Sequence, residues 1–595
     1  MTHPAILPLL IAPLSLPADP PVTPVAPPQE SAAPGAGAES QSGGPVRLMS
    51  LHMGDLTKAP QHPKDAALVN ALKMLDERLA ELPAEVGREM PPEILPAFEA
   101  DSIPIWLRLL TAQKRISVSG VPGGGGGMGP GMPFAFSFAV DEANELDAAR
   151  LEDSLMGLLQ RMQAPPQVTG MIQREGAALT VNMGSELLPL GATKAAGLLG
   201  GGSPSFEMDM DVGGYLQFLQ SMMMDAGAPY EAMIIFDVLS RMGLDEMTVQ
   251  VASTCDGTTS RMASIVSGMA GRMKASGMLP DSGLSAAHLA PVPANATWAS
   301  VQRLDMEAVF NALNGLASEY MQEQMGGESG DIADMVMNFT GIDLRSGLFG
   351  ALGDTYGMYA SETTGGGGLT STVLFFSLRD AEALLQTKEQ VEEMINGMAA
   401  GQANGYVNIR TWTRGDNEYS TLMFPGLPVP LEPTIAFGDE WLVVAATPQA
   451  AMGAMGQIAG SGPSLATRRE IAPLVADGSN VGVSFMDASH FARSGYGMTS
   501  MLLSGVSNGV RSRVDGLRDP GPIMPVYGEF QDGILNSVAF TKISGNDLVT
   551  HQSSDGSAVV QMAMMTGFFY EYGAAILAPA VLGAAAPQMA REFGF

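Results

Sequence analysis

The chain contains the same series of sequence features twice. Residues 365–398 read as a glycine run, an apolar strand leading to Asp380, and an amphipathic helix; residues 123–162 repeat this order around Asp141. A shift of 239 residues superimposes Asp141 on Asp380 without a gap. Because such self-similarity is typical of repeated supersecondary units, we interpret the chain as an internal duplication.

Each copy continues from its strand and helix into a predicted hairpin. The hairpins cover 168–183 in the first copy and 406–423 in the second. The order strand, helix, hairpin favours antiparallel sheet with helices on one face. The sequence therefore predicts an α+β fold of two related halves, residues 46–285 and 286–555, each mostly antiparallel sheet with amphipathic helices packed on one face. The first half has no clear counterpart of 433–458.

Five predicted strands end at an aspartate where a helix can begin. A carboxylate at this place accepts the free N–H groups of the first helical turn, which stabilises the helix by about 1 kcal/mol. Five caps in different repeats have no reason to converge in space, so we do not read them as catalytic or metal-binding carboxylates. The residues are Asp141, Asp211, Asp305, Asp380 and Asp487.

Several local patterns predict single elements. Leucines at 4-3-4-3 spacing indicate an amphipathic helix over 64–82. Thr447 followed by Pro448 is a specific helix start and predicts a helix over 448–458. Residues 527–530 and 534–543, separated by Asp532-Gly533, suggest a hairpin.

The N-terminus predicts export. Residues 1–18 contain an apolar stretch with the length of a signal-peptide core, although no Lys or Arg precedes it and prolines interrupt it. Residues 19–45 are rich in Pro, Ala, Gly and Ser, and we expect a disordered tether because little apolar surface is available to bury. We therefore expect an extracytoplasmic location, in the periplasm or at the cell surface.

The C-terminal segment, residues 556–595, is apolar and predicted to be helical. Residues 572–590 nearly reach the length of a membrane span, but they are rich in Ala and contain two prolines. A helix packed against the domains is our expectation, and membrane insertion is the alternative. Envelope association could thus involve either terminus.

Composition excludes some functions. Acidic residues number 62 against 31 basic ones, a net charge of −31, and no Lys/Arg cluster provides a local exception, so nucleic-acid binding is not expected. The 42 methionines suit an irregular core or an adaptable apolar surface. The single cysteine, Cys255, excludes an internal disulfide and C-x-x-C motifs. The six histidines show no zinc-binding spacing, so we predict no metal and no cofactor.

A weak hydrolase pattern is present. Ser507 lies in a G-x-S-x-G sequence and is followed by Asp532 or Asp547 and then by His551, the chain order of α/β-hydrolases. A nucleophile elbow requires a strand before the serine and a parallel sheet, whereas the residues before Ser507 have helical character. We therefore predict no catalytic residues, with Ser507, Asp532 and His551 as an outside candidate.

The second half resembles a known family. A Pro-Ala opening leads into a strand, Asp305 and a helix; Thr-Gly-Ile-Asp at 340–343 and Ala-Leu-Gly-Asp at 351–354 follow. Together these motifs resemble an uncharacterised bacterial domain-of-unknown-function family of exported, repeat-containing α+β proteins, over about residues 288–550. The resemblance implies export and a repeated architecture, and it assigns no site residues.

Three functional hypotheses follow. The first is a non-enzymatic, exported structural or interaction protein with an unknown protein partner. The alternative is a binder of apolar ligands, lipid or peptide, in a Met-rich groove between sheet and helices. The third, a serine hydrolase, requires Ser507, an aspartate and His551 within hydrogen-bonding reach.

Overall fold

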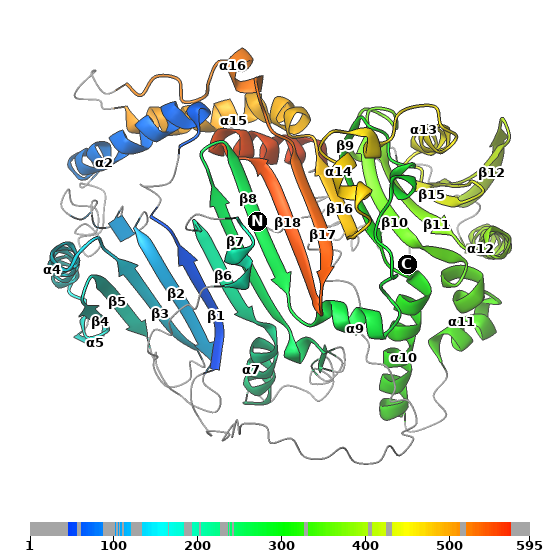
Figure 1. The fold of residues 1–595 in the computed structure, drawn as a ribbon, viewed down its shortest axis with the longest axis horizontal. Coiled ribbons are helices and arrows are strands. Elements are labelled where there is room, and N and C mark those ends of the chain that lie inside the picture. The colour runs from blue at the N-terminus through cyan, green and yellow to red at the C-terminus, as the bar shows by residue number, and fades with distance from the viewer. Residues whose placement is uncertain are drawn as a thin grey trace.

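One large antiparallel sheet forms the protein (Figure 1). The computed structural model describes residues 46–55, 61–86, 112–120, 134–164, 166–183, 193–200, 204–225, 243–325, 331–402, 407–423, 431–511 and 519–572, with single residues between 102 and 109 and between 236 and 240. Within these ranges the sheet has 18 strands, and all strand pairs are antiparallel. The predicted segments 1–18, 19–45 and 573–595 lie outside the described residues.

The first half supplies eight neighbouring strands. Their spatial order follows from the pairings between them. From the outer edge inward they are β4 (Ile172–Glu175), β5 (Ala178–Met183), β3 (Phe134–Asp141), β2 (Gln113–Gly120), β1 (Val46–Met53), β6 (Phe206–Asp211), β7 (Thr248–Cys255) and β8 (Thr259–Val266).

The second half repeats this order with one insertion. From its outer edge inward it has β12 (Asn408–Arg414), β13 (Asn417–Met423), β14 (Thr434–Phe437), β15 (Trp441–Ala445), β11 (Thr372–Leu378), β10 (Leu352–Ser361), β9 (Ala296–Arg303), β16 (Asn480–Met486), β17 (Ser537–Ser544) and β18 (Asp547–Asp555). Strands β14 and β15 separate β13 from β11, whereas β5 pairs directly with β3. The predicted α+β fold with two related halves is confirmed.

The two halves meet along their last strands. β8 pairs with β18 over eight residues, from Val266 opposite Leu548 to Thr259 opposite Asp555. Because these two strands are equivalent and antiparallel, the halves are related by an approximate two-fold axis through this seam. The two halves thus form one continuous sheet rather than two separate sheets.

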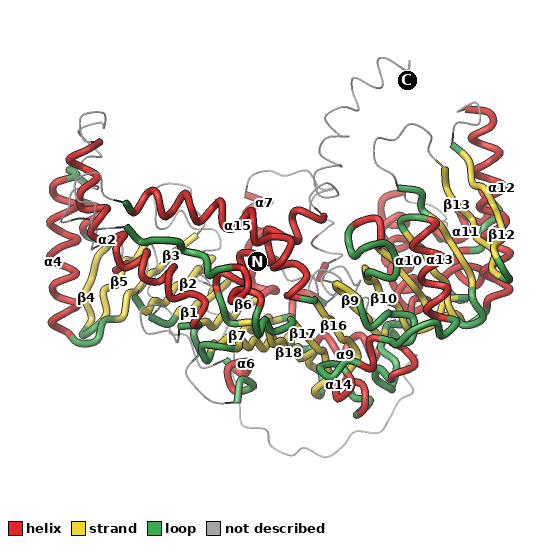
Figure 2. Tube along the Cα trace, turned by 90° about the horizontal axis from the view of Figure 1, so that it is seen from above, coloured by secondary structure: helices red, strands yellow, loops and turns green. Residues whose placement is uncertain are grey.

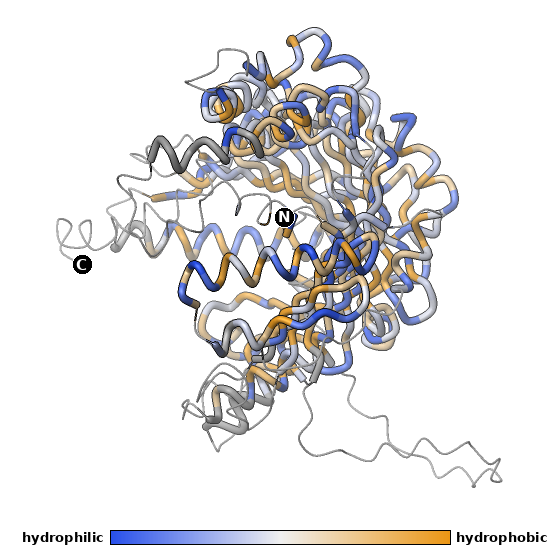
Figure 3. Tube along the Cα trace, turned by 90° about the vertical axis from the view of Figure 1, so that its left-hand side faces the viewer, coloured by the Kyte–Doolittle hydropathy of each residue, from blue (hydrophilic) through white to orange (hydrophobic). Residues whose placement is uncertain are grey.

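The long helices cover one face of this sheet. Val140 and Phe138 pack under α4, Phe376 and Leu378 under α12, and Trp298 beside α15. Figure 3 shows apolar and polar residues alternating along α4. This pattern is expected for a helix that buries one apolar side against the sheet and exposes the other side to solvent. These helices are α2 (Ala66–Val86), α4 (Glu145–Arg161), α7 (Val212–Asp225), α10 (Met306–Met325), α12 (Ala381–Gln402), α15 (Ala488–Val510) and a C-terminal helix, residues 558–572.

Shorter helices lie on the opposite face, which the sequence did not predict. Ala195 and Leu199 of the α6 region pack on Ala263 and Val549, and α13 and α14 pack on the core that contains Phe375 and Val483. Figure 2 shows α15 and α2 on one side of the sheet and α6 and α14 on the other. Their bounds are Lys194–Gly197 for α6, Pro448–Ile458 for α13 and Ala472–Ala476 for α14.

The remaining helical turns connect these layers. Several buried methionines, Met269 and Met273 of α9 among them, fill the core at one end of the strands. The connecting elements are η1 (Pro63–Asp65), α5 (Pro166–Thr169), η3 (Leu244–Glu246), α9 (Met269–Ala275), η4 (Ala286–Leu289), α11 (Ile332–Thr340), η5 (Leu344–Phe349), η6 (Leu369–Ser371), η7 (Leu465–Thr467) and α16 (Tyr527–Gln531).

Four of the five predicted aspartate caps are present. Each carboxylate accepts a hydrogen bond from the backbone N–H three residues later, at 2.9 to 3.0 Å, in Asp211, Asp305, Asp380 and Asp487. The prediction for Asp141 was wrong. Strand β3 continues through Asp141, whose carboxylate binds the Arg115 guanidinium at 2.6 and 2.8 Å, and Asn144 caps α4 instead.

Candidate functional site

A groove of about 500 Å³ lies over the seam between the two halves. Its floor consists of β8, β18 and β17, on the sheet face opposite α15. Leu198 and Leu199, next to α6, form one wall, and residues 469–474 form the other. Neither half builds the groove alone, since β8 and α6 come from the first and the remaining elements from the second.

On the floor, the strand register places polar side chains of β8 and β18 beside apolar side chains of β17. Arg261 lies opposite Ser553, and Ser553 lies opposite Val538. In the next row on the same face, His551 lies opposite Phe540 and Ala263. Because alternate residues of a strand share a face, Arg261 and His551 are diagonal neighbours, roughly 7–8 Å apart in backbone position.

His551 packs against a neighbouring aromatic side chain on the floor. Its ring stacks on Phe540, with the ring centres 5.0 Å apart and the planes 20° apart. Its Nε2 atom is buried and has no hydrogen-bond partner among the described residues. Burial lowers the pKa of His551, and the positive charge of Lys542 lowers it further. The imidazole is therefore neutral at neutral pH.

One groove wall carries a carboxylate that is already engaged. Glu470 accepts a hydrogen bond from the Asn536 amide at 3.0 Å, and Arg468 lies 3.6 Å away. Burial alone would raise the pKa of Glu470, but hydrogen bonds from its own backbone and Asn536, together with nearby arginines, lower it. The adjacent Arg469 is exposed and forms no ion pair or hydrogen bond with another described residue.

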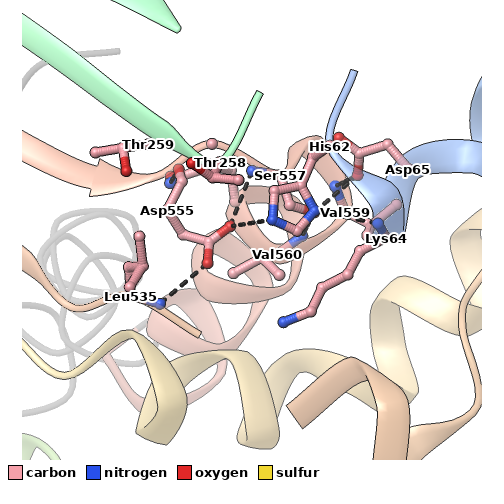
Figure 4. A network of polar contacts seen from close by, with 12 residues as sticks. His62, Lys64, Asp65, Thr258, Thr259, Leu535, Asp555, Ser557, Val559 and Val560 are labelled. Atoms are coloured by element: carbon pink, nitrogen blue, oxygen red, sulfur yellow. Dashed lines mark hydrogen bonds and ion pairs between the residues drawn. The ribbon is translucent and has the colours of Figure 1, made fainter. Parts of the chain in front are cut away.

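A buried polar network lies at the end of β18, next to the groove residue Leu535 (Figure 4). The Asp555 carboxylate is fully buried and accepts hydrogen bonds from the backbone N–H groups of Leu535, at 3.0 Å, and Ser557, at 2.9 Å. His62 Nε2 lies 4.0 Å from this carboxylate. Leu535, which lines the groove, is thereby fixed to the end of β18.

Asp65 extends the network to the C-terminal helix. Its Oδ1 accepts hydrogen bonds from Ser557 Oγ at 2.7 Å and Val559 N at 3.0 Å, and its Oδ2 accepts one from Ala558 N at 2.8 Å. An aspartate from the first half thus caps a helix that packs on the second half. Lys64 adds a contact to the carbonyl oxygen of Asp532 at 2.5 Å.

The structure does not bring the hydrolase candidates together. Ser507 lies in the last turns of α15, not after a strand, and its hydroxyl donates to the carbonyl oxygen of Gly521 at 3.2 Å. Asp532 follows α16, and the Asp547 carboxylate accepts from Gly268 N at 3.0 Å. His551 lies across the sheet from α15, in the groove.

The sequence singled out only one groove residue, His551, and for a different reason. Arg261, Arg469, Glu470 and Asn536 belong to no local motif. They meet because β8 pairs with β18, a contact between residues nearly 290 positions apart. The two halves end in equivalent strands, β8 and β18. The possibility that these strands pair with each other was the one signal that could have placed Arg261 near His551.

Other features have ordinary structural roles. Cys255 is half-buried, with its Sγ 3.9 Å from the carbonyl oxygen of Gly556. In the part of the chain that the structure describes, no group of three or more His, Cys, Asp or Glu side chains is placed to hold a metal. No described helix has both the length and the apolarity to cross a membrane. No family model, curated protein or solved structure matches the chain.

Proposed function

We propose that the protein is a non-enzymatic binding protein that holds a small molecule in the groove over the seam. The groove itself carries the proposal, because its volume of about 500 Å³ falls within the range of small-molecule sites. Its lining combines apolar side chains with a few convergent polar groups, which is the usual composition of such sites.

Binding explains the groove better than catalysis. Nucleophilic catalysis requires a hydroxyl or thiol within hydrogen-bonding reach of a base. Among the described residues, His551 Nε2 has no hydrogen-bond partner, and Ser507 donates to a backbone carbonyl on the other face. The described lining residues therefore provide recognition groups, and none of their hydroxyls is hydrogen-bonded to His551 Nε2.

The proposal develops the hypotheses from the sequence. It retains an interaction protein and takes from the alternative the idea of a groove, but Met262 is the one methionine in the lining. Export and the family resemblance remain part of the proposal. Export is supported by the composition of residues 1–45, and the resemblance by the motifs between 288 and 550.

The test is to identify molecules that co-purify with the full chain, by native mass spectrometry. Ser553→Trp places a bulky ring on the exposed floor of the groove, and Ser504→Trp makes the same change on the exposed surface of α15. We expect a bound species in the wild type and in Ser504→Trp, and its loss in Ser553→Trp. A bound species that persists in Ser553→Trp, or none in any sample, would contradict the proposal.

A further inference from the structure

We infer that the groove selects a small amphipathic anion, with its acidic head at Arg261 and Ser553 and its apolar part over Val538 and Phe540. This inference rests on the proposed function and names the class of ligand. It uses the charges in the lining, the separation of polar side chains on β8 and β18 from apolar side chains on β17, and the contacts that each charged group already makes.

The charges around the groove are positive, unlike those of the chain as a whole. The lining contains Arg261 and Arg469, and its one acid is Glu470. Lys542 lies on the same floor, opposite Val549 and one row beyond Phe540, and its charge acts on His551. In a chain with a net charge of −31, this local excess of cations favours an anionic ligand.

The charged groups differ in how firmly they are already bound. Glu470 is held by Asn536 and lies beside Arg468, so it offers little to a cationic ligand. Arg261 pairs with Asp256 at 3.4 Å, but both side chains are about half exposed, and such a pair contributes little. Arg469 forms no ion pair or hydrogen bond with a described residue, although its charge acts on the neighbouring Glu470. Both lining arginines can therefore bind a ligand anion at little cost.

The neighbouring acids do not cancel this preference. The Asp555 carboxylate, next to the groove residue Leu535, is fully buried and already accepts two backbone hydrogen bonds. Asp256 lies in the turn between β7 and β8, where its Oδ1 accepts from the backbone N–H groups of Thr258 and Thr259. Neither carboxylate is among the residues that line the groove.

The strands of the floor define the two ends of the ligand, because Arg261 lies on β8 and Ser553 on β18, whereas the apolar residues of β17 lie at the other side. Guanidinium and hydroxyl donors of Arg261 and Ser553 suit the oxygens of a carboxylate, sulfonate or phosphate, since charge-assisted hydrogen bonds are about twice as strong as neutral ones. The adjoining surface is apolar and comes from both walls and the floor: Leu198, Leu199, Leu474, Val538 and Phe540. An alkyl or aryl chain attached to the acidic head would cover this surface.

The test compares three probes that share one alkyl chain. Decanesulfonate, decanol and decyltrimethylammonium are titrated below micelle formation into the full chain by calorimetry. We expect decanesulfonate to bind about tenfold more tightly than decanol, because a hydrogen bond to a charged group contributes more than a neutral one. We expect the ammonium probe to bind least, because the lining arginines repel its positive charge.

Two arginine variants and a control locate the anion. Arg261→Gln and Arg469→Gln should each weaken decanesulfonate binding by about threefold to tenfold and leave decanol binding unchanged. Arg410→Gln, at an exposed position on edge strand β12 far from the groove, should change neither. All three arginines are exposed, so these variants are expected to fold, and thermal unfolding verifies it.

The outcomes separate the inference from the proposed function. Equal affinity for all three probes, with binding abolished by Ser553→Trp, would keep the groove as a binding site and overturn its selectivity for anions. Unchanged decanesulfonate affinity in both arginine variants would also overturn the inference. Binding of no probe, or binding that survives Ser553→Trp, would overturn the groove as the site.

Discussion

Gly495 of α15 and Gly567 of the C-terminal helix lie against each other's backbone where the two helices cross. A Cβ atom on Gly495 would come within 1.9 Å of the Ala563 carbonyl oxygen, and one on Gly567 within 1.9 Å of the Phe491 carbonyl oxygen. Thr499 and Thr566 join their hydroxyls at 2.7 Å beside this crossing. The absence of side chains therefore allows the C-terminal helix to reach the core around Phe491.

Substitution at the crossing should be strongly destabilising. Gly495→Ala forces two backbones apart, and we expect a loss of about 3 kcal/mol in the free energy of unfolding. Gly497→Ala is the matched control, because a Cβ atom on this exposed helical glycine would have no described atom within 4 Å. It should leave stability unchanged or raise it by up to about 1 kcal/mol. Urea unfolding measures both, and equal midpoints would contradict this packing.

The cap across the two halves gives a second prediction. Asp65→Asn replaces an acceptor oxygen by an amide that cannot accept the N–H group facing it, so we expect a loss of about 1–3 kcal/mol. Asp153→Asn, on the exposed side of α4, should have little effect. Thermal unfolding of the two variants makes the comparison. A midpoint for Asp65→Asn equal to that of Asp153→Asn would show that the cap is dispensable.

The pair formed by His490 and Glu571 predicts a pH dependence. His490 Nε2 lies 3.0 Å from the Glu571 carboxylate. The hydrogen bond to Glu571 raises the pKa of His490, against the opposing effect of burial, and the charges of Glu571, Asp487 and Glu362 raise it further. Because the folded pKa exceeds the unfolded one, this stabilisation is complete below the unfolded value of about 6.5 and is lost as pH rises through the folded value.

His490→Gln isolates this contribution. The difference in unfolding free energy between wild type and variant should be larger at about pH 5.5 than at about pH 8. Its size will be modest because the histidine is half-buried and solvent screens the pair. A difference that does not vary with pH, or that grows on the alkaline side, would contradict the assignment.

The glycine run before β11 gives a prediction at two adjacent residues. Gly367 has a φ of +90°, and a Cβ atom there would lie 2.4 Å from Thr297 Cγ2. Its carbonyl oxygen accepts hydrogen bonds from Thr297 at 2.9 Å and from Tyr572 at 2.8 Å. Gly367→Ala should therefore cost about 1–3 kcal/mol, whereas Gly368→Ala should be nearly neutral, since no described atom crowds its Cβ position. Thermal unfolding of both variants tests this, and similar losses in both would refute it.

Features encoded within a few residues were predictable from the sequence. The repeated order of strand and helix matched β3 with β11 and α4 with α12, although the caps of the two helices, Asn144 and Asp380, are 236 residues apart and the gapless shift of 239 was wrong at the level of single residues. The Thr447-Pro448 start matched α13, in which Thr447 accepts a hydrogen bond from Ala450 N. Such signals succeed because a cap or a periodic stripe depends on neighbours along the chain.

Features that depend on distant pairing were missed. Residues 527–530 were expected to form a strand, but they belong to α16, where Phe530 is buried against the α15 layer. Asp141 and Asn144 are both residues that can cap a helix, and the pairing of Asp141 with Gln113 and Ala178 extends β3 and leaves the cap to Asn144. The groove was invisible for the same reason, because its floor exists only when β8 pairs with β18.

The pairing of β8 with β18 has a consequence for how this architecture can evolve. A chain with one repeat would leave the strand equivalent to β8 as an unpaired edge of the sheet. Pairing this edge would require a second identical chain, and the stability of that dimer would depend on the protein concentration. Covalent fusion makes that association intramolecular. Fusion also allows the sequences of the two halves to differ. Arg261 of the first half thus lies opposite Ser553 of the second half and diagonal to His551. A homodimer would carry the same side chains on both sides of its axis, whereas in the single chain the two sides of the seam carry different side chains.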